Sequence, residues 1–104
     1  LMARYGGDEF GLAWPGHSDE DLEQLSEAIK DHIEKHPFEV AGNKVPVTLS
    51  FGIACYPIDG ASRHDLLNVA DRNLYEIKQA GGGIRRASMA DRENRALRSQ
   101  ASFE

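Results

Sequence analysis

Cysteine, long apolar runs and basic charge are all scarce in this sequence, and each scarcity excludes a class of protein. The single cysteine among 104 residues, Cys55, cannot form an internal disulfide. It lies in an apolar, strand-like run, where a buried thiol usually serves as a small hydrophobic side chain. No apolar stretch approaches the roughly 20 residues needed to cross a bilayer, and no signal-peptide pattern is present. We therefore expect a cytoplasmic chain.

The shortage of positive charge argues against nucleic-acid binding. The chain has 12 Lys and Arg against 17 Asp and Glu, a net charge of -5. Residues 1–83 carry most of the acids, whereas residues 84–104 hold 5 Arg against 3 acids. A phosphate backbone requires a positive protein face, which an acidic body does not provide. We interpret the arginine-rich end as a solvated polar extension, with anion contact as the alternative.

Short strands and a turn open the chain. Tyr5-Gly6-Gly7-Asp8 predicts a tight hairpin, because two glycines supply the positive φ angles of a two-residue type I′ turn. Residues 1–5 and 10–14 are short apolar or aromatic segments typical of its two strands.

Two helices follow from capping and periodicity. Ser18 with Asp21, and Ser62 with Asp65, have the spacing of a capping box. We expect the first helix to end at Pro37, and the second near Lys78, before three consecutive glycines. Each helix has one apolar stripe, formed by Leu22, Leu25, Ile29 and Ile33 in the first and by Leu67, Ala70, Leu74 and Ile77 in the second.

Between the helices the sequence predicts a small hairpin and one long strand. Residues 38–40 and 44–47 flank a turn at 41–43, and alternation then continues from 45 to 55. Both faces of this strand are nearly apolar, so we expect close packing on both sides. We also expect a short strand at Ile84. Residues 87–104 show no apolar stripe and are predicted to be a frayed helix or disordered, which places the domain in residues 1–86.

Three ordered blocks resemble one known family. The string Arg4-Tyr5-Gly6-Gly7-Asp8-Glu9-Phe10 is similar to the hairpin that names the GGDEF domain of diguanylate cyclases. Residues 47–54 with Tyr56-Pro57 look like the central strand of that family, and Ala70-Asp71, Leu74-Tyr75 and Lys78 look like its last helix. The resemblance covers roughly residues 3–83. It implies an α+β fold, a palm-like sandwich of the ferredoxin or nucleotidyl-cyclase type, with an antiparallel-rich sheet, helices packed on it and its first half missing.

The signature residues also make chemical sense by themselves. Glycines in a turn let a phosphate or ribose approach the backbone, because no Cβ stands in the way. The adjacent carboxylates of Asp8 and Glu9 are hard oxygen ligands that suit Mg²⁺ carrying a nucleoside triphosphate. On a strand, neighbouring side chains point to opposite faces, so the two need not share one ion. From these residues alone, an acidic, solvated hairpin tip remains the alternative.

By resemblance, two GTP molecules are joined into cyclic di-GMP, and pyrophosphate leaves. The family pattern makes Asp8 and Glu9 the catalytic and metal-binding residues, for Mg²⁺ or Mn²⁺. It places Gly6 and Gly7 against the nucleotide and directs Lys78 to the terminal phosphates. It further implies a homodimer, since each domain holds one GTP, and an upstream sensory or regulatory domain. Without the family, Lys78 reads as a solvated lysine at a helix end.

The chain departs from the family pattern at two places. The opening half of the domain is absent, with a further metal-binding Asp on its first strand, so we expect the chain alone to be unstable, swapped with a copy of itself or held by that half. The last helix is followed by Gly81-Gly82-Gly83 where the family has Gly-Arg-Asn, and the family arginine contacts phosphate. The alternative function is therefore a degenerate module that binds GTP or a protein partner without turnover. A different palm-type nucleotidyl transferase is a third reading.

Two histidines stand one helical turn apart. His32 and His36 have an i, i+4 spacing that can bind zinc, but no third ligand lies nearby in the sequence. We interpret both as solvent-facing residues.

Overall fold

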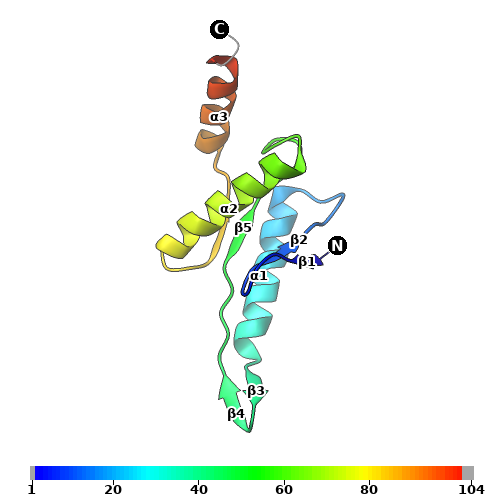
Figure 1. Cartoon of the computed structure of the whole chain (residues 1–104), viewed down its shortest axis with the longest axis vertical. Coiled ribbons are helices and arrows are strands. Elements are labelled where there is room, and N and C mark those ends of the chain that lie inside the picture. Colours follow the sequence, from blue (N-terminus) through cyan, green and yellow to red (C-terminus); the bar gives the residue numbers. More distant parts are fainter. Residues whose placement is uncertain (1, 102–104) are drawn as a thin grey trace.

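The chain forms an elongated molecule of three helices and six short strands among its described residues (Figure 1). The computed structural model describes residues 2–101, and side chains as far as residue 97. Its extents are 62 × 28 × 24 Å. This mixture confirms the expected α+β class. The elements are β1 (Met2–Arg4), β2 (Phe10–Leu12), α1 (Asp19–Lys35), β3 (Phe38–Val40), β4 (Asn43–Val45), β5 (Phe51–Ile53), α2 (Arg63–Gln79), β6 (Ile84–Arg86) and α3 (Met89–Ala101).

Both predicted helices begin at the predicted caps. Asp21 N donates to Ser18 Oγ at 3.1 Å, and Ser18 N donates to the Asp21 carboxylate at 3.2 Å, which completes a capping box. At α2 only one half of the box forms, the bond from Asp65 N to Ser62 Oγ at 3.1 Å. These bonds satisfy backbone N–H groups that a helix start leaves without partners.

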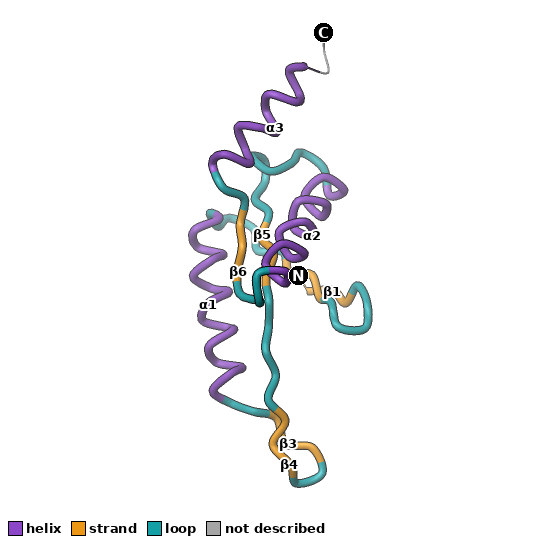
Figure 2. The backbone as a smooth tube through the Cα atoms, turned by 90° about the vertical axis from the view of Figure 1, so that its left-hand side faces the viewer, coloured by secondary structure: helices purple, strands orange, loops and turns teal. Residues whose placement is uncertain are grey.

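The centre of the molecule is the parallel pair β5–β6, which lies between α1 and α2 (Figure 2). Phe51 pairs with Ile84, so the short strand expected at Ile84 is present. The buried Asn73 of α2 donates from Nδ2 to the Ile53 carbonyl oxygen at 2.9 Å, tying the helix to the strand. Helices therefore pack on both sides of β5, as its two apolar faces predicted.

At Gly52 the backbones of β5 and α2 lie close together. A Cβ added to Gly52 would lie 2.1 Å from the Ala70 carbonyl oxygen and 2.5 Å from Leu74 N, both backbone atoms of α2. Backbone atoms in a packed helix cannot move aside as a flexible side chain can. The absence of a side chain at this position therefore sets the distance between the strand and the helix.

We expect Gly52→Ala to destabilise the module by about 3 kcal/mol or more, at the upper end of overpacking effects. The urea midpoint of the complete protein that contains this module, with and without the substitution, measures the effect. An unchanged midpoint would show that α2 does not rest on β5 as closely as the structure has it.

The apolar core is small. Among the described residues, the only buried apolar side chains are Ile53, 7% exposed, and Ala87, 4% exposed. Large apolar side chains face solvent instead, with Phe10 64% and Tyr75 65% exposed. The β1–β2 hairpin contacts no other described strand or helix. The expected instability of the isolated chain stays a prediction, and a core this small is what that prediction requires.

Two expectations about the strands were wrong in detail. Gly6 and Gly7 do not have positive φ, and the reversal is a five-residue loop, residues 5–9, with Arg4 paired to Phe10. A longer loop spreads the reversal over more residues, so no left-handed pair is needed. The two-residue turn with two positive φ angles lies between β3 and β4 instead, at Ala41 (51°) and Gly42 (81°).

The long strand expected over residues 45–55 is hydrogen-bonded as a strand only at 51–53. A strand needs a neighbour to pair with, and β6 is only three residues long.

The end of the chain is helical within the described residues. Asp91 N donates to Ser88 Oγ at 3.1 Å and Ser88 N donates back to the Asp91 carboxylate at 3.0 Å, a second complete capping box. Of the two alternatives left open for this segment, the structure has the helix as far as residue 101, while residues 102–104 lie outside the described part. No helix in the described part is long and apolar enough to cross a membrane.

Candidate functional site

The signature residues lie in the exposed loop that joins β1 to β2. Within the described part of the chain, the side chains of Asp8 and Glu9 are exposed and have neither a hydrogen bond nor an ion pair. A Cβ added to Gly6 or Gly7 would meet nothing within 4 Å. Neither the backbone angles nor the packing of this chain therefore requires glycine there. The open backbone is free for a ligand to approach.

The loop is held by a residue to which sequence reasoning gave no role. The guanidinium of Arg4 donates from Nε to the Gly6 carbonyl oxygen at 3.0 Å and from Nη2 to the Gly7 carbonyl oxygen at 2.9 Å. Tyr5 N also donates to the Glu9 carbonyl oxygen at 2.9 Å. The signal that could have found this role is an arginine placed two and three residues before two exposed glycines.

Lys78 lies in the last turn of α2, exposed, and among the described residues its side chain has no hydrogen-bond partner. No described contact brings α2 to β1 or β2. This structure therefore does not unite the predicted site residues: the loop holds Asp8 and Glu9, and the end of α2 holds Lys78. Their assignment as site residues stays a prediction.

The three glycines after α2 have left-handed backbone. Their φ angles are 106°, 98° and 127° from Gly81 to Gly83, and Gly82 N donates to the Ile77 carbonyl oxygen at 2.7 Å. A Cβ on Gly82 would lie 3.2 Å from Ser50 Oγ. An arginine at this position would be strained in this conformation, since L side chains rarely adopt such angles. The backbone conformation at Gly82 therefore favours glycine over the arginine of the family pattern.

The donor set of the loop fits one class of metal. The described residues contain no group of three or more His, Cys, Asp or Glu that could enclose an ion. His32 and His36 stack, with ring centroids 4.2 Å apart, and His36 Nδ1 is hydrogen-bonded to the His32 carbonyl oxygen at 2.8 Å. Two free carboxylates in an open loop do suit Mg²⁺, which usually takes one or two carboxylates and completes its shell with substrate phosphates and water.

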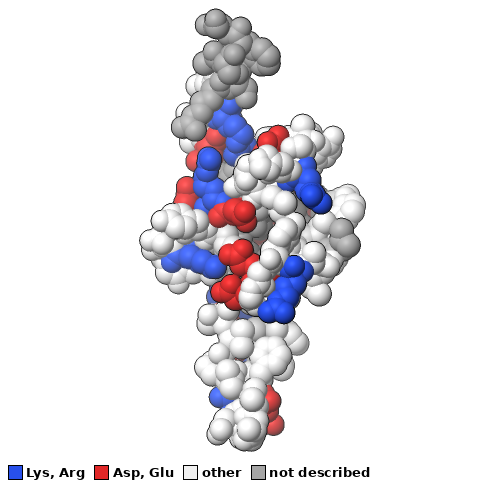
Figure 3. Space-filling view, in the orientation of Figure 1, with Lys and Arg blue, Asp and Glu red and all other residues white. Residues whose placement is uncertain are grey.

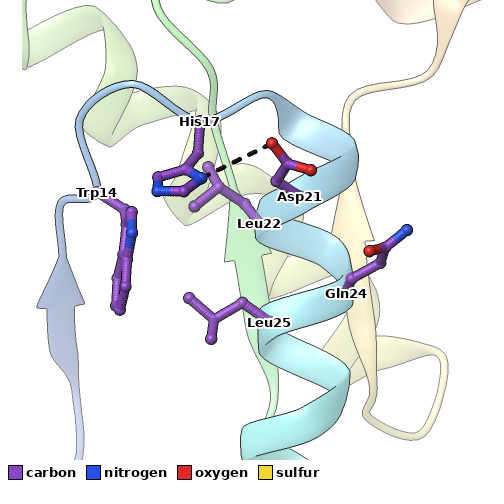
Figure 4. A pocket seen from close by; sticks show the side chains of 6 residues that line it. All are labelled: Trp14, His17, Asp21, Leu22, Gln24 and Leu25. Atoms are coloured by element: carbon purple, nitrogen blue, oxygen red, sulfur yellow. Dashed lines mark ion pairs between the residues drawn. The ribbon is translucent and has the colours of Figure 1, made fainter.

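One cavity lies away from these residues. It measures about 500 Å³ beside α1, where Trp14 faces Leu22 and Leu25 (Figure 4). His17 pairs with Asp21 at 3.7 Å and meets the Trp14 ring edge-on. None of the signature residues lines it. Its described lining combines the apolar side chains of Trp14, Leu22 and Leu25 with the polar side chains of His17, Asp21 and Gln24, and it contains no Lys or Arg.

A network of charges joins the start of α3 to the body, where basic and acidic side chains gather side by side (Figure 3). Asp59, 1% exposed, accepts from Cys55 N at 2.8 Å, from Arg92 Nε at 2.9 Å and from Arg95 Nη1 at 3.1 Å. Arg92 also donates to Asp19 at 2.8 Å. Sequence reasoning missed this network, because its arginine–aspartate pairs join residues 33 to 73 positions apart.

The pKa values of the network carboxyls follow from these contacts. Burial acts to raise the pKa of Asp59, but hydrogen bonds from Arg92, Cys55 and Arg95 outweigh it and lower that pKa below its usual value. The same balance, with Arg92 and Arg86 as donors, lowers the pKa of Asp19. Both carboxyls are therefore ionised at neutral pH.

Comparison with known proteins gives one family. Residues 1–83 match the family described as "Diguanylate cyclase, GGDEF domain". The bifunctional diguanylate cyclase/cyclic di-GMP phosphodiesterase MucR of Pseudomonas aeruginosa is 38% identical over 80 residues, which is 77% of this chain and 12% of that protein. Diguanylate cyclase A of Treponema denticola is 35% identical, over 76% of this chain and 21% of that protein. The response regulator PleD of Caulobacter vibrioides is 34% identical, over 78% of this chain and 18% of that protein. The chain thus spans about a fifth or less of these relatives' lengths.

Proposed function

Because the chain belongs to the GGDEF family of diguanylate cyclases, we propose that the protein containing it condenses two GTP molecules into cyclic di-GMP. The observation that carries the proposal is the open backbone of Gly6 and Gly7 next to two free carboxylates. No contact within the described part of the chain explains those glycines, whereas a nucleotide lying against the loop does.

In the proposed reaction, the 3′-hydroxyl of each GTP attacks the α-phosphorus of the other, so that two phosphodiester bonds form and two pyrophosphates leave. Asp8 and Glu9 hold Mg²⁺ or Mn²⁺, which when bound neutralises charge on the phosphates and lowers the pKa of the hydroxyl. Asp8 also helps to take the hydroxyl proton. Gly6 and Gly7 let the nucleotide approach the main chain, and Lys78 contacts its terminal phosphates. Catalysis is then mainly positioning and charge neutralisation.

Two copies of the module facing each other are needed, because each holds one GTP. The exposed position of the loop is compatible with such an arrangement. We propose a homodimer in the cytoplasm, where GTP is available, under the control of an upstream sensory or regulatory domain. The relative PleD is named a response regulator.

A second candidate is a module that binds GTP or a protein partner without turnover. Gly82 favours it, because the family's phosphate-contacting arginine is missing and the left-handed backbone disfavours any side chain there. A lost cation weakens the stabilisation of the transferring phosphoryl group more than it weakens the binding of the base.

The test is to incubate the complete protein with GTP and Mg²⁺ and to separate the products by liquid chromatography with mass spectrometry. The first candidate predicts cyclic di-GMP and pyrophosphate, with none formed in the presence of a chelator. GTP binding by calorimetry without any product would support the second candidate and overturn the first.

Gly7→Ala adds the same methyl group as Gly52→Ala, but in an open loop instead of a packed strand. We expect unfolding stability to change by less than about 0.5 kcal/mol, because an added Cβ meets nothing within 4 Å. We expect the KM for GTP to rise on the order of tenfold, because the same Cβ stands where the nucleotide lies, at a cost of about 1.4 kcal/mol. Urea unfolding measures the stability, and initial rates at varied GTP concentration measure the KM. Wild-type KM in a stable variant would place the nucleotide elsewhere.

A further inference from the structure

We propose that Arg4 is a positioning residue that holds the Gly6–Glu9 loop in its substrate-binding conformation through the carbonyl oxygens of Gly6 and Gly7. The proposal rests on the proposed function of the loop and adds a residue to it. Arg4 lies on β1, two residues before the loop's first glycine, and its side chain is directed back over the loop by two hydrogen bonds.

The loop has few other restraints. Besides the two bonds from Arg4, its described backbone bonds are those from Tyr5 N and Gly6 N to the Glu9 carbonyl oxygen, at 2.9 and 3.4 Å. Nothing packs against Gly6 or Gly7. Glycine has the widest range of backbone conformations, so two adjacent glycines without packing would sample many states. The bonds from Arg4 are therefore a main source of order at these residues.

The chemistry of the contact requires arginine. The planar guanidinium presents donors in a rigid fork, so Nε and Nη2 reach two carbonyl oxygens at once, at 3.0 and 2.9 Å. The ammonium of a lysine is a compact charge on a flexible stem and does not reproduce the fork. A role that needed only positive charge would be met by either residue.

The two hydrogen bonds from Arg4 also determine which backbone groups of the loop remain available to a ligand. Arg4 occupies the carbonyl oxygens of the two glycines and offsets their negative partial charge. Within the described residues, no protein acceptor takes the N–H groups of Gly7 and Asp8. A loop with these two carbonyls bonded to Arg4 and its amides without a protein acceptor suits an anionic ligand such as a nucleoside triphosphate.

The experiment compares Arg4→Lys, Arg4→Gln and the control Arg63→Gln in the complete protein. Arg63 is an exposed arginine at the start of α2 without an ion pair among the described residues. We expect both Arg4 variants to lose about 10²-fold in kcat/KM for GTP, the effect of a mispositioned site. Their urea midpoints should match the wild type, because Arg4 is exposed. The control should keep wild-type kinetics.

A second readout follows the loop without any turnover. Endoproteinase Glu-C cleaves after Glu9, and mass spectrometry gives the rate of that cut. We expect Arg4→Gln and Arg4→Lys to be cut about tenfold faster than wild type, because charge-assisted hydrogen bonds have been lost. Arg63→Gln should be cut at the wild-type rate.

Two results would overturn the proposal. The first is an Arg4→Lys variant that keeps at least half of the wild-type kcat/KM, which would assign Arg4 a role by charge alone. The second is an unchanged rate of cleavage after Glu9 in both Arg4 variants. A wild-type protein that forms no cyclic di-GMP would contradict the proposed function. The protease assay would then still decide whether Arg4 holds the loop.

Discussion

Asp8→Ala is expected to abolish cyclic di-GMP formation by the complete protein. The carboxylate of Asp8 is exposed and makes no contact within the described chain, so its removal costs the fold nothing that the structure shows. In the proposed reaction it holds the metal and helps to take the proton of the attacking hydroxyl. Metal binding and proton removal each lower the activation free energy by several kcal/mol, so the loss of both should lower kcat by about 10³-fold or more.

The matched control is Asp31→Ala, which removes an exposed carboxylate from α1 and an ion pair with Lys35. Such surface pairs contribute little, so this variant should retain wild-type kcat. Asp8→Asn keeps the size of the side chain while removing its charge, and it should be as inactive as Asp8→Ala. Initial rates of product formation at saturating GTP and Mg²⁺ measure all three. Product formation that survives at Asp8→Ala would remove Asp8 from the catalytic assignment.

Asp59→Ala is expected to lower the free energy of unfolding by about 3–5 kcal/mol. The carboxylate is 1% exposed and faces Arg92, whose side chain is 16% exposed. Removing one partner of a buried ion pair leaves the other charge without compensation. It also leaves Cys55 N without its acceptor and releases Arg95. The opening free energies of residues 55–60 and 89–95, obtained by amide hydrogen exchange in the complete protein, measure the loss.

A double substitution separates the pair from its surroundings. Asp59→Asn combined with Arg92→Met removes both charges and keeps a donor and acceptor near Cys55, so it should recover much of the loss at Asp59→Ala. A cost below about 1 kcal/mol for Asp59→Ala, within the range of exposed pairs such as Asp31 with Lys35, would mean that α3 is not held by this network.

The same network predicts the effect of acid. The folded-state pKa values of Asp59 and Asp19 lie below the unfolded value of about 3.9. Their contribution is therefore complete above about pH 4 and is lost as the pH falls through the lowered folded-state values. Hydrogen exchange in the α3 segment should be constant, after correction for the intrinsic rate, from pH 7 to about 4.5. Loosening of α3 above pH 5 would contradict these shifts.

The parts of the fold that are local in the chain could be predicted. Ser18 with Asp21 signalled the start of α1 because a cap involves residues three apart. The small residues at 48–54 signalled that β5 is packed on both faces, and Gly52 against Ala70 shows how closely. The turn at Gly6 was misjudged, since two glycines are compatible with both a two-residue turn and a longer loop.

The charge network could not be predicted, because charge pairing across long separations leaves no periodic pattern. Asp59 follows a strand as an ordinary turn residue, and Arg92 belongs to a segment with no apolar stripe. Only the fold brings them to 2.9 Å. The position of Lys78 relative to the loop shows the same limit, since no described contact joins α2 to the hairpin.

By itself, the sequence determined the family and both long helices, since each depends on residue types at short and constant spacing. Tertiary structure alone decided three further features: the bracing of the glycines by Arg4, the left-handed backbone at Gly82 and the anchoring of α3 on Asp59. The first two depend on where a side chain points or how the backbone turns in space, which residue types alone do not specify. The third depends on residues 33 positions apart in the chain.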